Sequence, residues 1–95
     1  MKTVVYDPIN GEAIPDGSVM DFALNLPEKG IVTVSNEIVF LAIRVLIIRE
    51  QLDYKDIQFM YKEEVLSVNE KGRPSHWPNG FCDLSEQFLE AIFGL

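Results

Sequence analysis

The sequence predicts a single α/β domain of the α+β kind, spanning residues 1–95, with one layer of helices against one small mixed sheet. Its length of 95 residues is that of one domain. Its apolar content of 47% is enough for a core that needs neither a disulfide nor a metal. Short β-branched runs alternate with longer runs of helical spacing. Together these features predict the element order ββαβαββα.

The N-terminal third is expected to hold two strands and one helix. Residues 3–6 are β-branched or aromatic and predict a strand. After a turn rich in Pro, Asn and Gly, residues 12–14 are expected to return as a short antiparallel strand. Apolar side chains recur at helical spacing over residues 19–26, and Ser18 or Asp16 is expected to cap that helix.

A β-α-β unit is expected in the middle of the chain. Residues 31–34 form a short continuous apolar run, which is typical of a strand covered on both faces. The longest helix is expected over residues 36–52 with Ser35 as its N-cap, and a strand over residues 57–61 follows it. The two strands of this unit should be parallel, and the crossover between them should be right-handed.

The last elements are expected to be a hairpin strand and a helix. Residues 65–68 should pair with the preceding strand across a polar tip at Glu63 and Glu64. The final helix is expected over residues 84–93. Its inner face should be formed by Phe88, Leu89, Ile92 and Phe93.

The helix over residues 36–52 gives the main indication of a partner. Residues 38–48 are all apolar except Arg44. A helix that is hydrophobic on every side needs cover on every side, either from layers of this small fold or from another chain. The side chains expected to serve such a contact are Phe40, Arg44, Ile47, Trp77 and Phe81.

Two interpretations of Trp77 and Phe81 stay open. The favoured one is that both aromatic rings anchor the final loop to the core, with Pro78 and Gly80 setting the bend between them. The other is that they form an exposed contact patch, where aromatic residues are often the main contributors to binding.

Charge and hydropathy exclude several classes of ligand. The net charge is −7, from 15 acidic and 8 basic residues, and the basic residues are scattered. Nucleic acids and anionic membranes are bound through a basic face, so neither is expected as a direct partner. The longest apolar stretch, residues 38–48, is too short to span a membrane, which takes about 20 residues. With no signal peptide evident, a cytoplasmic location is expected.

The sequence lacks the residue sets that catalysis or cofactor binding requires. Cys82 is the only cysteine and His76 the only histidine, so a zinc site is not expected. A Cys/His nucleophile would need the two side chains to meet, and Cys82 is better explained as a small buried hydrophobe. We therefore expect no enzymatic activity, no cofactor and no metal.

Two segments resemble the C-terminal part of a family of predicted ABC-type AAA ATPases from bacterial and phage genomes. Residues 32–38 read VTVSNEI and are similar to the family's strand ending Thr-His-Ser-Glu-His-Leu. Residues 69–83 read NEKGRPSHWPNGFCD and are similar to the family's closing stretch, a strand followed by Asp-Gly-Arg and then Trp-Pro-x-Gly-Phe-Phe-Asp. Between them, residues 56–61 suit the family's Asp-Val-x-x-Tyr-Phe strand. The similarity covers about residues 30–93.

The departures from that family concern its chemistry. Val34 stands where the family has a nucleotide-sensing histidine, and it offers no hydrogen bond to a phosphate. The phosphate-binding G-x-x-x-x-G-K-[ST] loop is absent. The resemblance therefore implies a stand-alone or decayed lobe that kept its packing and does not hydrolyse ATP. Small proteins of this kind are commonly borne by a phage or mobile element.

The leading functional hypothesis is a non-catalytic protein-interaction module or small regulatory subunit. It would partner an ATPase, as the resemblance implies, or associate with itself as a homo-oligomer. Two alternatives remain: an acidic inhibitor that imitates nucleic acid, which the net charge of −7 suggests, and a Cys/His-dependent enzyme.

Overall fold

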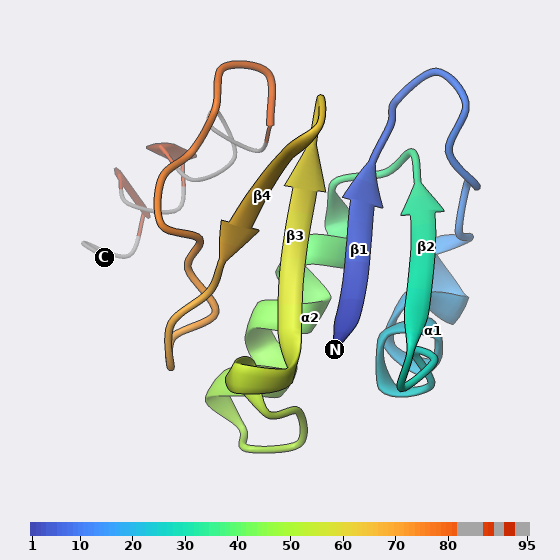
Figure 1. Cartoon of the computed structure of the whole chain (residues 1–95). Coiled ribbons are helices and arrows are strands. Elements are labelled where there is room, and N and C mark those ends of the chain that lie inside the picture. The colour runs from blue at the N-terminus through green and yellow to red at the C-terminus, as the bar shows by residue number, and fades with distance from the viewer. Residues whose placement is uncertain (82–86, 89–90, 93–95) are drawn as a thin grey trace.

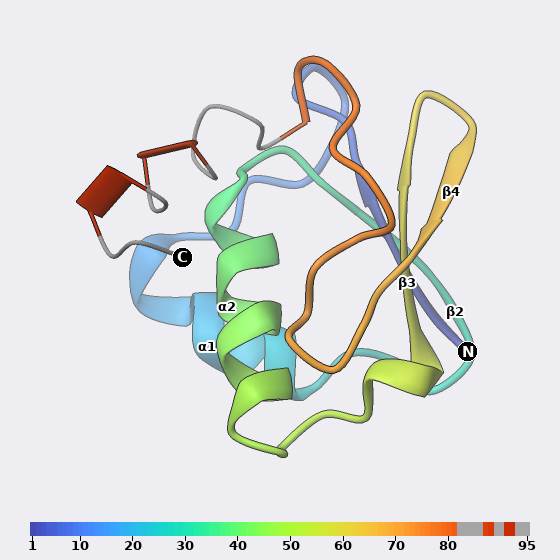
Figure 2. The same ribbon diagram turned by 90° about the vertical axis from the view of Figure 1, so that its left-hand side faces the viewer.

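The computed structural model describes residues 1–81, 87, 88, 91 and 92 of the chain. These residues form a four-stranded mixed sheet with two helices packed against one face (Figures 1 and 2), which confirms the predicted α/β class. The strands lie in the order β2-β1-β3-β4. The elements are β1 (Lys2–Tyr6), α1 (Val19–Leu24), β2 (Gly30–Val34), α2 (Ile38–Ile48), β3 (Ile57–Tyr61) and β4 (Glu64–Ser67).

Strand β1 lies at the centre of the parallel part of the sheet. It pairs in parallel with β2 on one side and with β3 on the other, and β3 pairs antiparallel with β4. The β2–α2–β3 unit is therefore parallel, but its connection crosses over β1. In Figure 1 α2 lies behind the sheet and β3 lies to the left of β2, which makes this crossover right-handed. Helix α1 lies on the same face of the sheet as α2, but the β1–α1–β2 connection leads from β1 to a strand on its right in Figure 1. This crossover is therefore left-handed.

The antiparallel strand expected at residues 12–14 is not formed. Instead, Glu12 makes a single parallel bridge with Val34 at the outer edge of β2. The Glu12 amide donates to the carbonyl of Thr33, and the Ser35 amide donates to the carbonyl of Glu12, both at 2.9 Å. The chain leaving β1 thus crosses to the far edge of β2 rather than folding back on its own strand.

The ends of the helices also differ from the expectation. Helix α2 spans Ile38–Ile48 rather than residues 36–52, and Glu37 rather than Ser35 holds the N-cap position. Ser18 precedes α1, but its side chain makes no capping hydrogen bond. Asn36 has another role: its side-chain amide bonds both backbone groups of Ile14, at 3.2 and 2.7 Å, and tethers the first loop to the start of α2.

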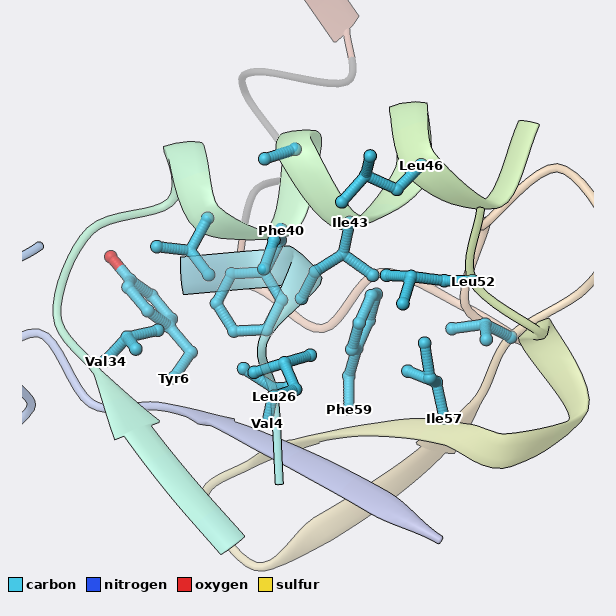
Figure 3. Packing of buried hydrophobic residues seen from close by; sticks show 14 of the residues in the cluster. Val4, Tyr6, Leu26, Val34, Phe40, Ile43, Leu46, Leu52, Ile57 and Phe59 are labelled. Atoms are coloured by element: carbon cyan, nitrogen blue, oxygen red, sulfur yellow. The ribbon is translucent and has the colours of Figure 1, made fainter. Parts of the chain in front are cut away.

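The core lies between the inner face of the sheet and α2 (Figure 3). Its centre is a group of aromatic rings from four parts of the chain. Phe40 of α2 is fully buried, with its ring centroid 4.9 Å from that of Phe59 and 4.9 Å from that of Phe81. Tyr6 of β1 meets the Phe40 ring edge to face at 5.9 Å. The loop after β4 is thereby joined to the helix and the sheet.

Of the helix expected over residues 84–93, the structure describes helical residues 87, 88, 91 and 92. Phe88 and Ile92 are 59% and 71% exposed, so the inner face expected for them is wrong. Residues four apart share one side of a helix, and this side faces solvent. Leu89 and Phe93 lie outside the described residues.

Candidate protein-interaction surfaces

Four of the five expected contact residues are buried inside the domain. Phe40 and Phe81 have no exposed surface, and Ile47 and Arg44 are 4% and 7% exposed. These four side chains face the sheet or the loop that covers α2, so they are not accessible to a partner. The expectation is corrected accordingly.

The fifth residue, Trp77, is half-buried in the same packed group. Its ring stacks on that of Phe81 with the centroids 5.9 Å apart, and the Arg44 guanidinium lies 5.8 Å from the Trp77 centroid. Contacts of this kind add to the burial of the aromatic ring. They support the anchoring interpretation, in which Trp77 and Phe81 hold the loop after β4 against α2.

Helix α2 nevertheless presents apolar side chains to solvent. Ile38, Val45 and Ile48 are 44%, 37% and 60% exposed, and Leu41 is half-buried. These four residues, spaced three or four apart, form one line along the helix, which we call the α2 stripe. Beside it, a shallow hollow of about 270 Å³ is lined by α1 and α2 side chains. They include Val19, Met20, Ile38, Leu41, Ala42 and Val45.

A second, uncharged surface covers the side of the sheet that the helices leave open. Side chains alternate between the two faces of a strand, so the register of the sheet assigns every second residue to this outer side. None of these positions carries a charge, although 24% of all residues in the chain are charged. The uncharged sheet face consists of Thr3, Val5, Ile31, Thr33, Gln58, Met60, Val65 and Ser67.

No described element crosses in front of this uncharged sheet face in Figure 1. Ile31 and Val65 are 66% and 53% exposed, and Val5 and Met60 are half-buried among their neighbours. The expectation that the strand at residues 31–34 is covered on both faces is therefore wrong within this chain. Parallel strands are normally covered on both sides, so an open, uncharged face on three of them is unusual.

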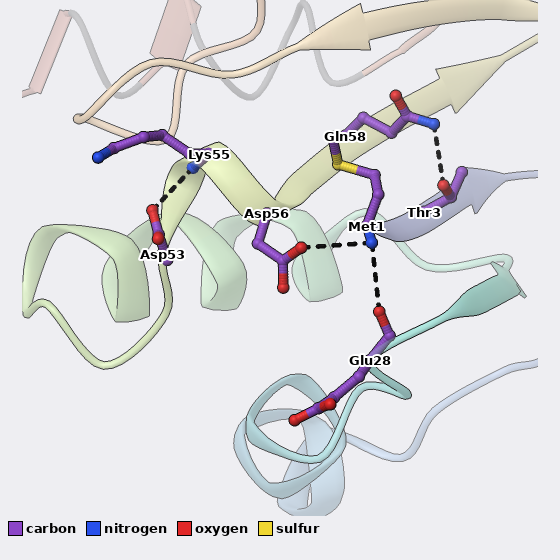
Figure 4. Close-up of polar contacts among 7 residues, drawn as sticks. All are labelled: Met1, Thr3, Glu28, Asp53, Lys55, Asp56 and Gln58. Atoms are coloured by element: carbon purple, nitrogen blue, oxygen red, sulfur yellow. Dashed lines mark hydrogen bonds and ion pairs between the residues drawn. The ribbon is translucent and has the colours of Figure 1, made fainter.

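Four of the eight positions on this surface are polar, and two of them are joined by a hydrogen bond. The Gln58 Nε2 donates a hydrogen bond to Thr3 Oγ1 at 3.0 Å (Figure 4). At the amino ends of the parallel strands, the Met1 ammonium pairs with Asp56 at 3.3 Å and donates a hydrogen bond to the Glu28 carbonyl at 3.4 Å. The hydrogen bond between Gln58 and Thr3 lowers the cost of burying these two side chains in a contact.

The uncharged sheet face continues into a hollow at the carboxyl ends of β1 and β3. This hollow has a volume of about 320 Å³, and its lining includes Val5, Pro8 and Ile9. At its rim, N–H groups of Asn10 and Ile9 donate to the Asp7 carboxylate and lower the pKa of Asp7, which keeps it charged. Lys62 and Glu63 also line this hollow, so the uncharged surface ends there in charged residues.

No group of three or more His, Cys, Asp or Glu side chains in residues 1–81, 87, 88, 91 and 92 is placed to hold a metal ion. His76 contacts Glu64 and the Ser75 hydroxyl. Cys82, the thiol of the Cys/His alternative, lies outside the described residues. Within the part of the chain that is described, no helix is both long and apolar enough to span a bilayer.

Sequence reasoning missed the uncharged sheet face, although a signal for it was present. In each strand the residues on the outer side are as uncharged as those on the inner side, as Thr3 and Val5 show for β1 and Met60 for β3. An antiparallel sheet with one wet face would show polar and charged residues at every second position. The absence of charged residues at these positions indicates that the outer face of the sheet differs from an ordinary solvent-exposed face.

Comparisons with known proteins do not assign the chain to a family. No family model, no curated protein and no solved structure matches it. The resemblance to the ABC-type ATPases therefore stays a hypothesis.

Proposed function

We propose that this chain is a non-catalytic protein-interaction module, serving as a small regulatory subunit, that buries its uncharged sheet face against protein. The observation that carries the proposal is the open outer side of the four-stranded sheet, where none of the eight positions is charged. Complete burial of a Val or Ile side chain is worth about 1.5–3 kcal/mol. Covering Ile31 and Val65 would thus supply a driving force for association.

The chemistry of this face favours protein over the other macromolecules. Binding to nucleic acid takes its affinity from Lys and Arg contacts to phosphate, and neither residue occurs among the eight positions. The net charge of −7 opposes approach to nucleic acid and to anionic lipid alike. An apolar protein surface has no such requirement. The resemblance to the ATPase family makes an ATPase the first heterologous partner to test, and self-association is the other route.

A comparison of three tagged baits tests the proposal. Val65→Lys places a charge on the uncharged sheet face, whereas Ile48→Lys places the same charge on the α2 stripe at similar exposure. Co-purification of a protein, including an untagged second copy, is expected with wild type and with Ile48→Lys. We expect at least about tenfold less with Val65→Lys, because a lysine buried in an apolar contact is strongly unfavourable.

Two results would contradict the proposal. In one, the wild-type bait retains neither a host protein nor a second copy. In the other, Ile48→Lys abolishes capture while Val65→Lys leaves it unchanged, which would place the binding surface on the helices.

A further inference from the structure

We infer that the outer edge of β2 receives an extended segment of a partner protein, which adds a fifth strand to the sheet through main-chain hydrogen bonds. This contact is distinct from burial of the uncharged sheet face, so the inference goes beyond the proposed function. Strand β2 ends the sheet on one side, in the order β2-β1-β3-β4. An edge strand offers unpaired N–H and C=O groups, and an added strand binds by pairing with them.

The register of the sheet identifies which backbone groups of β2 point outward. In a parallel ladder, alternate residues of a strand bond the same neighbour. The Val34 carbonyl accepts a hydrogen bond from the Asp7 N–H at 2.9 Å, so the backbone groups of Val34 and Val32 point toward β1. Those of Ile31 and Thr33, between and before them, therefore point away from β1, toward the edge.

The chain itself already adds one residue to this edge. Glu12 forms a parallel bridge with Val34, in which its N–H donates to the Thr33 carbonyl and its carbonyl accepts from the Ser35 N–H, both at 2.9 Å. The geometry of the edge thus admits a further strand. The bridge covers only the carboxyl end of β2. Within the described residues, the N–H and C=O of Ile31 and the N–H of Thr33 have no hydrogen-bond partner.

The opposite edge of the sheet is occupied by the chain at both ends of β4. At one end, the Ser75 N–H donates to the Ser67 carbonyl at 2.9 Å. At the other end, His76 contacts Glu64, the first residue of the strand. An incoming strand would have to displace both contacts. The edge of β2 is therefore the better site for strand addition.

Strand β2 also lacks the features that protect edge strands from pairing. Such strands usually carry a charged side chain, a proline or a bulge. Residues 30–34 read GIVTV, without charge or proline, and their pairing with β1 is continuous over all five residues. Ile31 is 66% exposed on one side of the strand, and Val32 is half-buried on the other. A neighbouring strand would cover both side chains.

The chemistry of this edge specifies its occupant. Free donors and acceptors at alternate residues match the backbone of an extended peptide. Beside Ile31 and Thr33, β-branched side chains pack best. The chain carries a net charge of −7, and the charged residues nearest to the open edge are Glu12, Glu28 and Lys29. A basic segment is therefore attracted, whereas a second acidic copy is repelled. The expected partner offers an extended, β-branched segment with basic flanks.

Amide hydrogen exchange measured by NMR tests the inference with a synthetic peptide. The probe is Lys-Lys-Val-Thr-Val-Thr-Val-Lys-Lys, and its matched control carries methyl groups on the five central amide nitrogens, which block main-chain pairing. With about 1 mM probe, exchange of the Ile31 and Thr33 amides should slow at least about twofold, because a bonded amide is protected. The Val65 amide, at the opposite edge, should exchange at an unchanged rate. The control peptide should protect none of the three.

A pair of variants separates the backbone contact from the side-chain contact. Ile31→Pro removes the outward N–H, and proline is tolerated on an edge strand where that N–H faces solvent. The probe should no longer protect the Thr33 amide in Ile31→Pro, and it should still do so in Ile31→Val, which keeps the N–H. Circular dichroism verifies that each variant is folded. If Ile31→Pro is unfolded, the comparison of the two peptides on wild type decides alone.

Failure of this inference can be told apart from failure of the proposed function. Unchanged exchange of Ile31 and Thr33 with about 1 mM probe overturns the inference, whatever Val65→Lys does to protein capture. Equal protection by the methylated control also overturns it. Protection that appears on raising the protein concentration alone assigns the edge to a second copy and contradicts the inferred partner. If the probe pairs with β2 while only Ile48→Lys abolishes capture, the inference stands and the proposed function fails.

Discussion

Phe40→Ala is expected to lower the free energy of unfolding by about 3–5 kcal/mol. The Phe40 ring is fully buried and meets the rings of Phe59, Phe81 and Tyr6, so its removal leaves a cavity where the helix, the sheet and the final loop join. The total stability of a domain of this size is about 5–15 kcal/mol. Urea denaturation followed by circular dichroism should show the midpoint falling by a large fraction, or the chain unfolded without denaturant.

Ile48→Ala is the matched control on the same helix. Ile48 is 60% exposed, so truncation should change the free energy of unfolding by less than about 1 kcal/mol. If the two variants lose the same stability, the assignment of the inner and outer sides of α2 is wrong.

Gly11→Ala is expected to cost about 3 kcal/mol, because no space exists for a side chain at this position. A Cβ atom on Gly11 would lie 2.4 Å from the carbonyl carbon of Val34 and 2.6 Å from the carbonyl oxygen of Asp7. Both contacts are with backbone, so the end of β2 must move, which strains the bridge between Glu12 and that strand. Thermal unfolding should show a clearly lower midpoint.

Gly17→Ala makes the same chemical change in the same long connection. No atom lies within 4 Å of a Cβ at Gly17. The free energy of unfolding should therefore change by less than about 1 kcal/mol, and loss of chain entropy in the unfolded state favours a slight increase. Equal losses in both variants would contradict the close approach at Gly11.

The local pattern of residues was sufficient to predict most of the elements. Strands β1, β2 and β3 and helix α2 form where β-branched or apolar runs are longest. The strand expected at residues 12–14 failed for a different reason. The residue types of this segment suit a strand, but the segment pairs through a single non-local bridge between Glu12 and Val34 and not with the strand before it. Local propensity carries no information about which distant strand a segment will reach.

The candidate site was predicted less well, and α2 shows why. An amphipathic helix reveals its inner side through its polar residues, but residues 38–48 contain a single polar residue, Arg44, and that residue is buried. The sequence therefore indicated that α2 has excess apolar surface, but it did not indicate which side of the helix faces the core. Tertiary packing placed Phe40 and Ile47 inward and left Ile38 and Ile48 in solvent.

For the strand at residues 31–34, the sequence predicted more burial than the structure of the single chain shows. Its continuous apolar run predicted cover on both sides, and one side is open, with Ile31 66% exposed. The pattern is that of a strand with two buried faces. On our account the prediction describes the associated form, in which a second chain supplies the missing layer.

The most direct test of this account is methyl NMR of the chain as its concentration is raised or a captured partner is added. We predict that methyl resonances of Val5, Ile31 and Val65 on the uncharged sheet face shift or broaden. Those of Val45 and Ile48 on the α2 stripe should stay in place. The reverse pattern, with changes confined to the α2 stripe, would contradict the claim that the open side of the sheet is the binding surface.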